Sequence, residues 1–148
     1  MKRICVLFCG LLTLSLTGTV RAAEESPAEK TARDWFLATL KGEREKVVKL
    51  TRVPFALGDI LIPSQQMMQE HVFSAIGRDD TQRKKAVDLT PEAIKVKTLP
   101  KYTTSSALRT QTIDQVGAHQ FVEVSIGDVK LVIYLTKGIK PKVVGFSK

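Results

Sequence analysis

The first helix of the chain is predicted by the pattern of residues 26–42. Ser26-Pro27-Ala28-Glu29 combines a capping hydroxyl, a proline at the first helical position and a glutamate placed to reach back to the cap's backbone N–H. The apolar residues that follow lie on one helical stripe: Ala28, Ala32, Trp35, Phe36 and Leu40. Gly42 is expected to end this helix, and residues 43–51 predict a second, shorter one.

The next part of the chain changes from an extended to a helical pattern. Residues 51–57 and 60–63 flank Gly58-Asp59, which predicts an extended passage broken by a turn. Ser64 is placed to cap a further helix over residues 65–76. The apolar residues of that helix recur at helical spacing: Met68, Val72, Ala75 and Ile76.

Three segments connect this helix to the C-terminal third. Residues 78–85 contain six charged side chains, which predicts a solvated loop or a frayed helix. Residues 94–99 alternate apolar positions with Lys95 and Lys97, which predicts a strand with one face in solvent. Within residues 100–116, Tyr102-Thr103-Thr104 favours an extended chain, and residues 108–116 leave two alternatives open, a strand or a helical turn.

A β-hairpin is the strongest local prediction in the chain. Residues 119–126 and 129–136 flank Gly127-Asp128, a two-residue connection of the kind that closes a tight hairpin. This turn predicts an aliphatic face formed by the pairs Ile126/Val129, Val124/Leu131, Val122/Ile133 and Gln120/Leu135. The opposite, mixed face is formed by Ser125/Lys130, Glu123/Val132, Phe121/Tyr134 and His119/Thr136. We expect the aliphatic face to turn toward the N-terminal helices, and residues 142–147 to supply a last strand.

Helices near the start and antiparallel strands near the end predict an α+β domain, in which the N-terminal helices pack on a curved, mainly antiparallel sheet. The helix ending in Trp35–Gly42, the Val53-Pro54-Phe55 passage and the final Val143–Phe146 strand resemble secreted bacterial members of the nuclear-transport-factor-2-like superfamily, over most of residues 27–147. The resemblance implies a sheet wrapped around the first helix as a conical cup, often with an internal pocket and with dimerisation through the sheet's other face. The superfamily includes ketosteroid isomerases, scytalone dehydratases and polyketide cyclases, as well as members that only bind, so the fold does not select a function.

The N-terminus has the pattern of a signal peptide. Met1-Lys2-Arg3 precedes an uncharged run over residues 4–16, and small residues follow at Ala22-Ala23. The run is short for a membrane span, which needs about 20 apolar residues, so an uncleaved anchor is the weaker alternative. We therefore expect residues 1–23 to be a signal peptide and residues 24–148 to be one secreted or periplasmic domain without a stable membrane anchor.

Composition restricts the chemistry of the mature domain. Both cysteines of the chain, Cys5 and Cys9, lie in the leader, so no disulfide, thiol nucleophile or thiolate metal site is expected. The leader carries three basic residues and no acid, so its removal lowers the formal charge from +8 to +5, a weak preference for acidic partners. His71 and His119 have no third ligand of matching spacing, so no metal or other cofactor is expected. Arg83-Lys84-Lys85 is too short to indicate nucleic-acid binding.

The candidate pocket residues come from the helices and from the aliphatic face of the hairpin. They are Trp35, Phe36, Phe55, His71 and Gln120. His71 flanks the apolar stripe of its helix and is a weak acid–base candidate, although a structural histidine is the simpler role. Gln120 is the polar residue of the aliphatic face, so it either pairs with backbone or orients a ligand. The three aromatic residues are most simply core, and they become pocket wall if the cup is partly empty.

A dimer interface is predicted on the mixed face of the hairpin. The residues assigned to it are His119, Phe121, Val132 and Tyr134. Together they form a half-apolar patch that a lone monomer is not expected to expose.

Two functions from different classes fit these patterns. The favoured one is a non-catalytic secreted domain that binds a small apolar ligand or a protein partner as a homodimer, because no set of polar residues converges. The alternative is a pocket enzyme of lyase or isomerase type, with His71 for acid–base catalysis and Gln120 orienting the substrate; it requires a second titratable group near His71 across an open cavity. A cystatin-type inhibitor is set aside, because Gln115-Val116-Gly117 lacks the Gln-x-Val-x-Gly spacing.

Overall fold

The computed structural model describes residues 24–76 and 88–148. The predicted leader and the charged segment 78–85 lie outside the described residues. The helices are α1 (Pro27–Lys41), α2 (Arg44–Leu50), α3 (Gln65–Ile76), the 3₁₀ helix η1 (Pro91–Ala93) and α5 (Ala107–Val116). The strands are β1 (Thr51–Leu57), β2 (Ile60–Ile62), β3 (Lys95–Leu99), β4 (Gln120–Ile126), β5 (Val129–Leu135) and β6 (Val143–Ser147).

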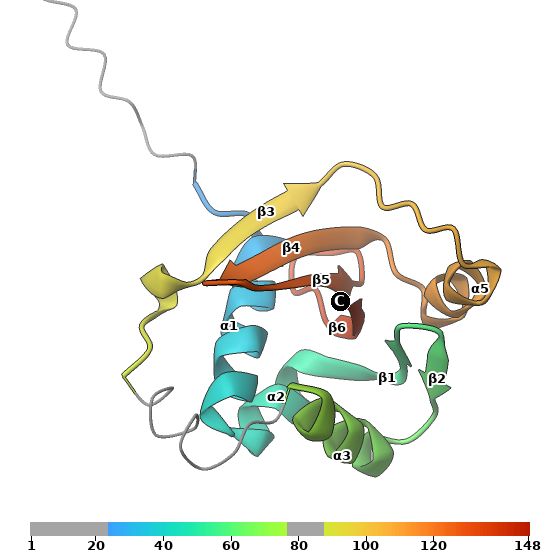
Figure 1. The fold of residues 1–148 in the computed structure, drawn as a ribbon, viewed down its shortest axis with the longest axis horizontal. Coiled ribbons are helices and arrows are strands. Elements are labelled where there is room, and N and C mark those ends of the chain that lie inside the picture. Colours follow the sequence, from blue (N-terminus) through green and yellow to red (C-terminus); the bar gives the residue numbers. More distant parts are fainter. Residues whose placement is uncertain (1–23, 77–87) are drawn as a thin grey trace, which may run out of the picture.

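The strands form one open, curved sheet in the order β2-β1-β6-β5-β4-β3. β1 and β6 pair in parallel, and the other neighbours pair antiparallel. α1 crosses one face of this sheet, and α2 and α3 pack beside it (Figure 1). The predicted α+β class, with N-terminal helices on a curved and mainly antiparallel sheet, is confirmed.

The capping sequence at the start of α1 forms the expected reciprocal hydrogen bonds. The Glu29 N–H donates to the Ser26 hydroxyl, and the Ser26 N–H donates to the Glu29 carboxylate. The same carboxylate accepts from the N–H and the hydroxyl of Thr98 on β3, so the cap also fastens α1 to an edge strand. The helix ends at Gly42, whose φ of 74° is the left-handed conformation that glycine adopts most readily.

The predicted hairpin register is confirmed. β4 and β5 pair from Gln120 with Leu135 through to Ile126 with Val129, as the Gly127-Asp128 turn requires. The buried members of the aliphatic face are Val122, Val124, Leu131, Ile133 and Leu135, and all belong to the hydrophobic cluster that contains Trp35 of α1. The aliphatic side therefore faces the N-terminal helices, as expected.

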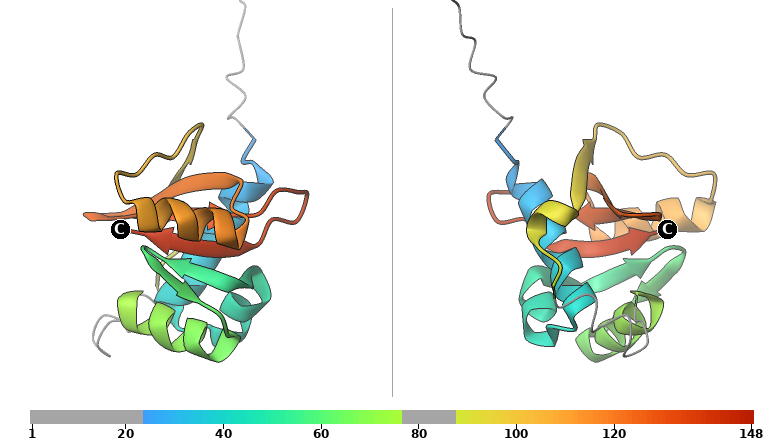
Figure 2. Two further views of the ribbon diagram at one scale, coloured as in Figure 1. Left: turned by 90° about the vertical axis from the view of Figure 1, so that its right-hand side faces the viewer. Right: turned by 60° about the vertical axis from the view of Figure 1, so that its left-hand side comes forward.

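A second hydrophobic cluster lies on the outer face of the sheet, away from α1. Its buried members are Ala56, Ile113, Val116, Tyr134 and Val144. Ile113 and Val116 come from α5, which lies against β1 and β6 and is seen in front of the strands, with α1 behind them, in the left view of Figure 2. Of the two alternatives for residues 108–116, the helical one is therefore right, and it is a full helix that covers the outer face.

An irregularity in β6 lets this strand contribute side chains to both hydrophobic clusters. Leu135 pairs with Val143 and Tyr134 pairs with Gly145, so Val144 is an extra residue in the ladder. A side chain at Gly145 has no room, because a Cβ there would lie 2.5 Å from the Ala56 carbonyl oxygen. The extra residue brings Val144 to the outer cluster and returns Phe146 to the inner one. Within residues 24–76 and 88–148, no helix is long and apolar enough to cross a membrane.

Candidate functional site

The concave side of the sheet is filled by the aromatic residues predicted as possible pocket wall. Trp35, Phe36 and Phe55 are each fully buried. The Trp35 ring lies 6.3 Å from that of Phe55 and 5.7 Å from that of Phe146, measured between centroids. The indole N–H donates to the Thr51 hydroxyl at 2.9 Å, so the one polar atom of the Trp35 side chain is also satisfied. These side chains fill the space inside the cup in which a ligand would have to bind.

The other two predicted pocket residues are not brought together. His71 is exposed on α3. Gln120 donates its amide N–H to the Thr136 carbonyl at 2.9 Å. Of its two predicted roles, pairing with the backbone is therefore the one that the structure shows. This arrangement gives the alternative function no histidine that faces a cavity.

The predicted dimer residues lie largely beneath other parts of the same chain. Tyr134 is fully buried, Phe121 and Val132 are half-buried, and His119 is exposed. The Tyr102 ring stacks on Phe121 at a centroid distance of 5.2 Å and helps α5 to cover this face. The premise of the predicted interface, an uncovered half-apolar face, is therefore wrong for a physical reason: α5 and the Tyr102 loop occupy it.

This covered face contains a hydrogen-bonded pair of tyrosines. The Tyr134 hydroxyl donates to the Tyr102 hydroxyl at 3.4 Å, and the Tyr102 hydroxyl lies 2.9 Å from that of Ser147. Tyr102 also lines a hollow of about 370 Å³ whose other walls include Thr110 and Asp114. Tyr102 is thus a candidate acid–base residue beside a hollow, whereas His71 and His119 are exposed on the surface.

The environments of the two phenols move their pKa values apart. Burial alone raises the pKa of Tyr102, but the Ser147 hydroxyl, the Tyr134 hydroxyl and nearby Arg109 together lower it below its usual value. Burial raises the pKa of Tyr134 well above its usual value. Tyr102 is therefore the tyrosine that ionises first.

A pH titration tests this separation, because the chain has two tyrosines, Tyr102 and Tyr134. The phenolate absorbance should rise in two steps, one below and one above the ordinary tyrosine pKa of 10.0. The lowered pKa of Tyr102 adds stability as pH rises through its folded-state pKa, whereas the raised pKa of Tyr134 removes stability above about pH 10. Tyr102→Phe should abolish the early step alone; a single two-proton step near the ordinary pKa would contradict the assignment.

A second cluster of polar and apolar side chains lies where the β1–β2 turn meets the start of α5. The Asp59 carboxylate accepts from the Arg109 guanidinium at 3.0 Å and from the Ser106 hydroxyl at 3.1 Å. Beside this pair, three large apolar side chains are exposed: Ile60 at 60 %, Leu61 at 38 % and Leu108 at 62 %. We call Asp59, Ile60, Leu61, Leu108 and Arg109 the hairpin corner.

The hairpin corner has the features of a recognition surface. It lies at the end of the sheet, because among the described residues β1 is the one strand that pairs with β2. A hollow of about 260 Å³ adjoins it, with Leu57, Ala75 and Phe146 on its apolar side and Arg109 and Ser147 on its polar side. An edge strand flanked by exposed apolar side chains is a ready template for pairing with another chain.

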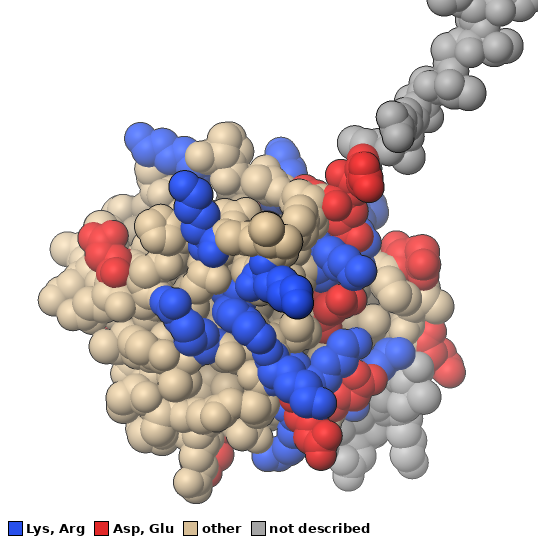
Figure 3. Space-filling model, turned by 180° about the vertical axis from the view of Figure 1, so that it is seen from behind, with Lys and Arg blue, Asp and Glu red and all other residues tan. Residues whose placement is uncertain are grey.

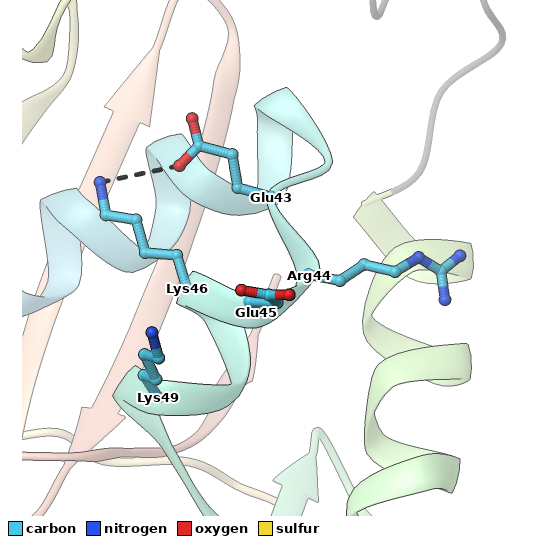
Figure 4. A pocket seen from close by; sticks show the side chains of 5 residues that line it. All are labelled: Glu43, Arg44, Glu45, Lys46 and Lys49. Atoms are coloured by element: carbon cyan, nitrogen blue, oxygen red, sulfur yellow. Dashed lines mark ion pairs between the residues drawn. The ribbon is translucent and has the colours of Figure 1, made fainter.

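A larger hollow of about 480 Å³ lies along α2 and is lined by Glu43, Arg44, Glu45, Lys46 and Lys49. Figure 4 shows that these side chains fan out from the helix instead of converging on one point. Arg44 reaches toward α3, where its guanidinium lies 5.0 Å from the Phe73 ring, and Lys46 pairs with Glu43 at 3.8 Å. This hollow has no set of groups aimed at a common ligand.

Sequence reasoning missed Tyr102, Arg109 and Ser147, and it treated Asp59 as a local turn residue. The available signals were Ser106 and Gly117, which bracket α5 as its N-cap and its left-handed C-cap. Among the described residues, no three histidine, aspartate or glutamate side chains gather as a metal site. No protein-family model matches the chain, and no curated protein or solved structure matches it significantly.

Proposed function

We propose that the chain is a non-catalytic binding domain that acts outside the cytoplasm and recognises a protein partner through the hairpin corner. The first partner is a second copy of the chain, so that the domain works as a homodimer. One observation carries this proposal: exposed Ile60, Leu61 and Leu108 surround a sheet edge that has a free side. The uncharged run of the predicted leader supports a location outside the cytoplasm. Because the core is filled, a partner that binds at the surface is favoured over an apolar ligand that binds inside the cup.

The backbone of β2 supports the edge as the point of contact. Leu57 pairs with Ile60 next to the turn, and Leu61 is the next residue along the strand. Successive residues of an antiparallel ladder direct their backbone groups alternately toward and away from the neighbouring strand. Leu61 therefore directs its N–H and C=O to the free side, where a second β2 strand related by a two-fold axis would pair with it.

Sedimentation of the wild-type chain and a Leu61→Lys/Leu108→Lys variant tests the homodimer. A lysine at each position places a charge in the apolar contact and disfavours strand pairing at the free edge of β2. The dissociation constant of the dimer should therefore rise at least tenfold. The matched control is Ile139→Lys, since Ile139 is also an exposed large apolar residue but lies on the β5–β6 loop. The proposal fails if the wild type is monomeric at every concentration or if the control dissociates equally.

A second candidate function is favoured by Tyr102. A pocket enzyme of lyase or isomerase type needs a group whose pKa is shifted toward working pH, and Tyr102 has a lowered pKa at the edge of a hollow. In this version of the alternative, Tyr102 replaces His71 as the acid–base group and Arg109 stabilises its phenolate. The tyrosine titration described above tests it: a Tyr102 pKa at or above the ordinary value of 10.0 rules this version out, because the phenol would then not be activated.

A further inference from the structure

The loop between β5 and β6 has an exposed apolar side chain at its tip. Ile139 is 90 % exposed, more than any other large apolar residue in the described part of the chain. Gly138 precedes it with a φ of 129°, a conformation that side chains disfavour. The left view of Figure 2 shows the loop, drawn in red, projecting beyond the strands.

The base of this loop is closed by two hydrogen bonds. The Thr136 N–H donates to the Lys142 carbonyl at 2.9 Å, and the Lys142 N–H donates to the Thr136 hydroxyl at 2.9 Å. Pro141 is buried beside them. The tip is therefore presented from a fixed base and not from a long open linker.

Basic side chains surround the tip. Lys137, Lys140 and Lys142 lie in the loop, and residues 136–142 contain no acid. The Lys142 ammonium donates to the Lys49 carbonyl, which places the loop against the end of α2. We call Lys137, Lys140 and Lys142 the basic surface. Seen from behind, lysine and arginine side chains gather across the middle of the molecule (Figure 3).

We propose that the β5–β6 loop docks the domain reversibly on an anionic phospholipid bilayer. Ile139 enters the boundary between headgroups and acyl chains, while the basic surface contacts lipid phosphates. A bilayer accepts a single apolar side chain without a shaped pocket, whereas a protein partner needs one that fits Ile139. Positive charge around the tip complements anionic headgroups. This docking is independent of the hairpin corner.

Vesicle flotation of the full chain tests the proposal. The chain should float with vesicles of phosphatidylcholine and phosphatidylglycerol, much less with phosphatidylcholine alone, and less as salt is raised. Lys137→Ser/Lys140→Ser should lower partitioning about twenty-five-fold, since each lysine near an anionic surface contributes about fivefold. Ile139→Ser should lower it about tenfold, because its apolar surface stays in water.

The control variants remove the same kinds of side chain from parts of the surface outside the β5–β6 loop. Lys95→Ser/Lys97→Ser removes the same charge from exposed positions of β3, and Met67→Ser removes an exposed large apolar side chain from α3, outside the hairpin corner. Both should partition within about twofold of the wild type, since only the β5–β6 loop places an apolar tip and its lysines in the bilayer interface. All variants share one N-terminus, so any contribution of residues 1–23 is common to them. The proposal is overturned if the anionic vesicles capture no wild-type chain, or if the controls lose as much binding as the loop variants.

Discussion

Trp35→Ala should lower the free energy of unfolding by about 3–5 kcal/mol, the usual cost of removing a large aromatic side chain from a core. Trp35 is fully buried and contacts the rings of Phe55 and Phe146, which come from the neighbouring parallel strands β1 and β6. Its loss leaves a cavity between α1 and these strands. It also removes the indole donor from the Thr51 hydroxyl, which itself donates to the Val47 carbonyl.

Urea unfolding followed by circular dichroism measures this effect, because the variant lacks the single tryptophan of the chain. Trp35→Phe is the matched control. It keeps an aromatic ring but loses the hydrogen bond to Thr51, so the expected cost is smaller, about 1–3 kcal/mol. If Trp35→Ala stayed within about 1 kcal/mol of the wild type, the side chain would not be core, and a cup open to ligands would return as an explanation.

The parts of this fold that were predictable from sequence are those set by neighbours in the chain. Ser26 and Glu29 are three positions apart, so the cap of α1 depends on no distant contact. The Gly127-Asp128 turn likewise sets the whole β4–β5 register, since one turn fixes which residues pair. Local geometry therefore determined which side of the hairpin faces α1.

The parts that were missed depend on distant contacts. The extra residue at Val144 lies in a strand that pairs with β1 on one side and β5 on the other, and no local pattern signals it. α5 has a weak apolar stripe, with Ile113 and Val116 facing the sheet and Leu108 exposed. Its helical state is stabilised by packing on the outer face, which the pattern of residues 100–116 alone does not contain.

The same missing contacts explain the misplaced candidate site. Because α5 covers the outer face, Tyr134 is part of the core. The exposed apolar side chains are instead Ile60, Leu61 and Leu108 at the hairpin corner. Asp59 illustrates the change. The sequence predicted it only as part of a turn, but its side-chain partners are Ser106 and Arg109, about 50 positions away, so only the folded chain brings this ion pair together.

Tyr134→Lys should destabilise the domain itself by about 3–5 kcal/mol, the range measured when a buried charge lacks a partner. The Tyr134 side chain is fully buried between Tyr102 and Phe121, with ring centroids 5.5 and 5.6 Å away. A lysine there either keeps its charge in an apolar site or gives up its proton at a cost, and the ring contacts are lost in both cases. Thermal unfolding at two protein concentrations measures the effect.

The concentration dependence separates the second core from a dimer interface. If Tyr134 is core, the loss of stability is the same at low and high protein concentration, because dimerisation through the hairpin corner stabilises the variant and the wild type equally. If Tyr134 lay at an interface, the variant would remain a stable monomer and lose only the concentration-dependent part of its stability. His119→Lys is the control on the same face, where an exposed side chain should change stability by about 0.5 kcal/mol or less. A stable, monomeric Tyr134→Lys variant would restore the interface on the mixed face and remove the reason for moving recognition to the hairpin corner.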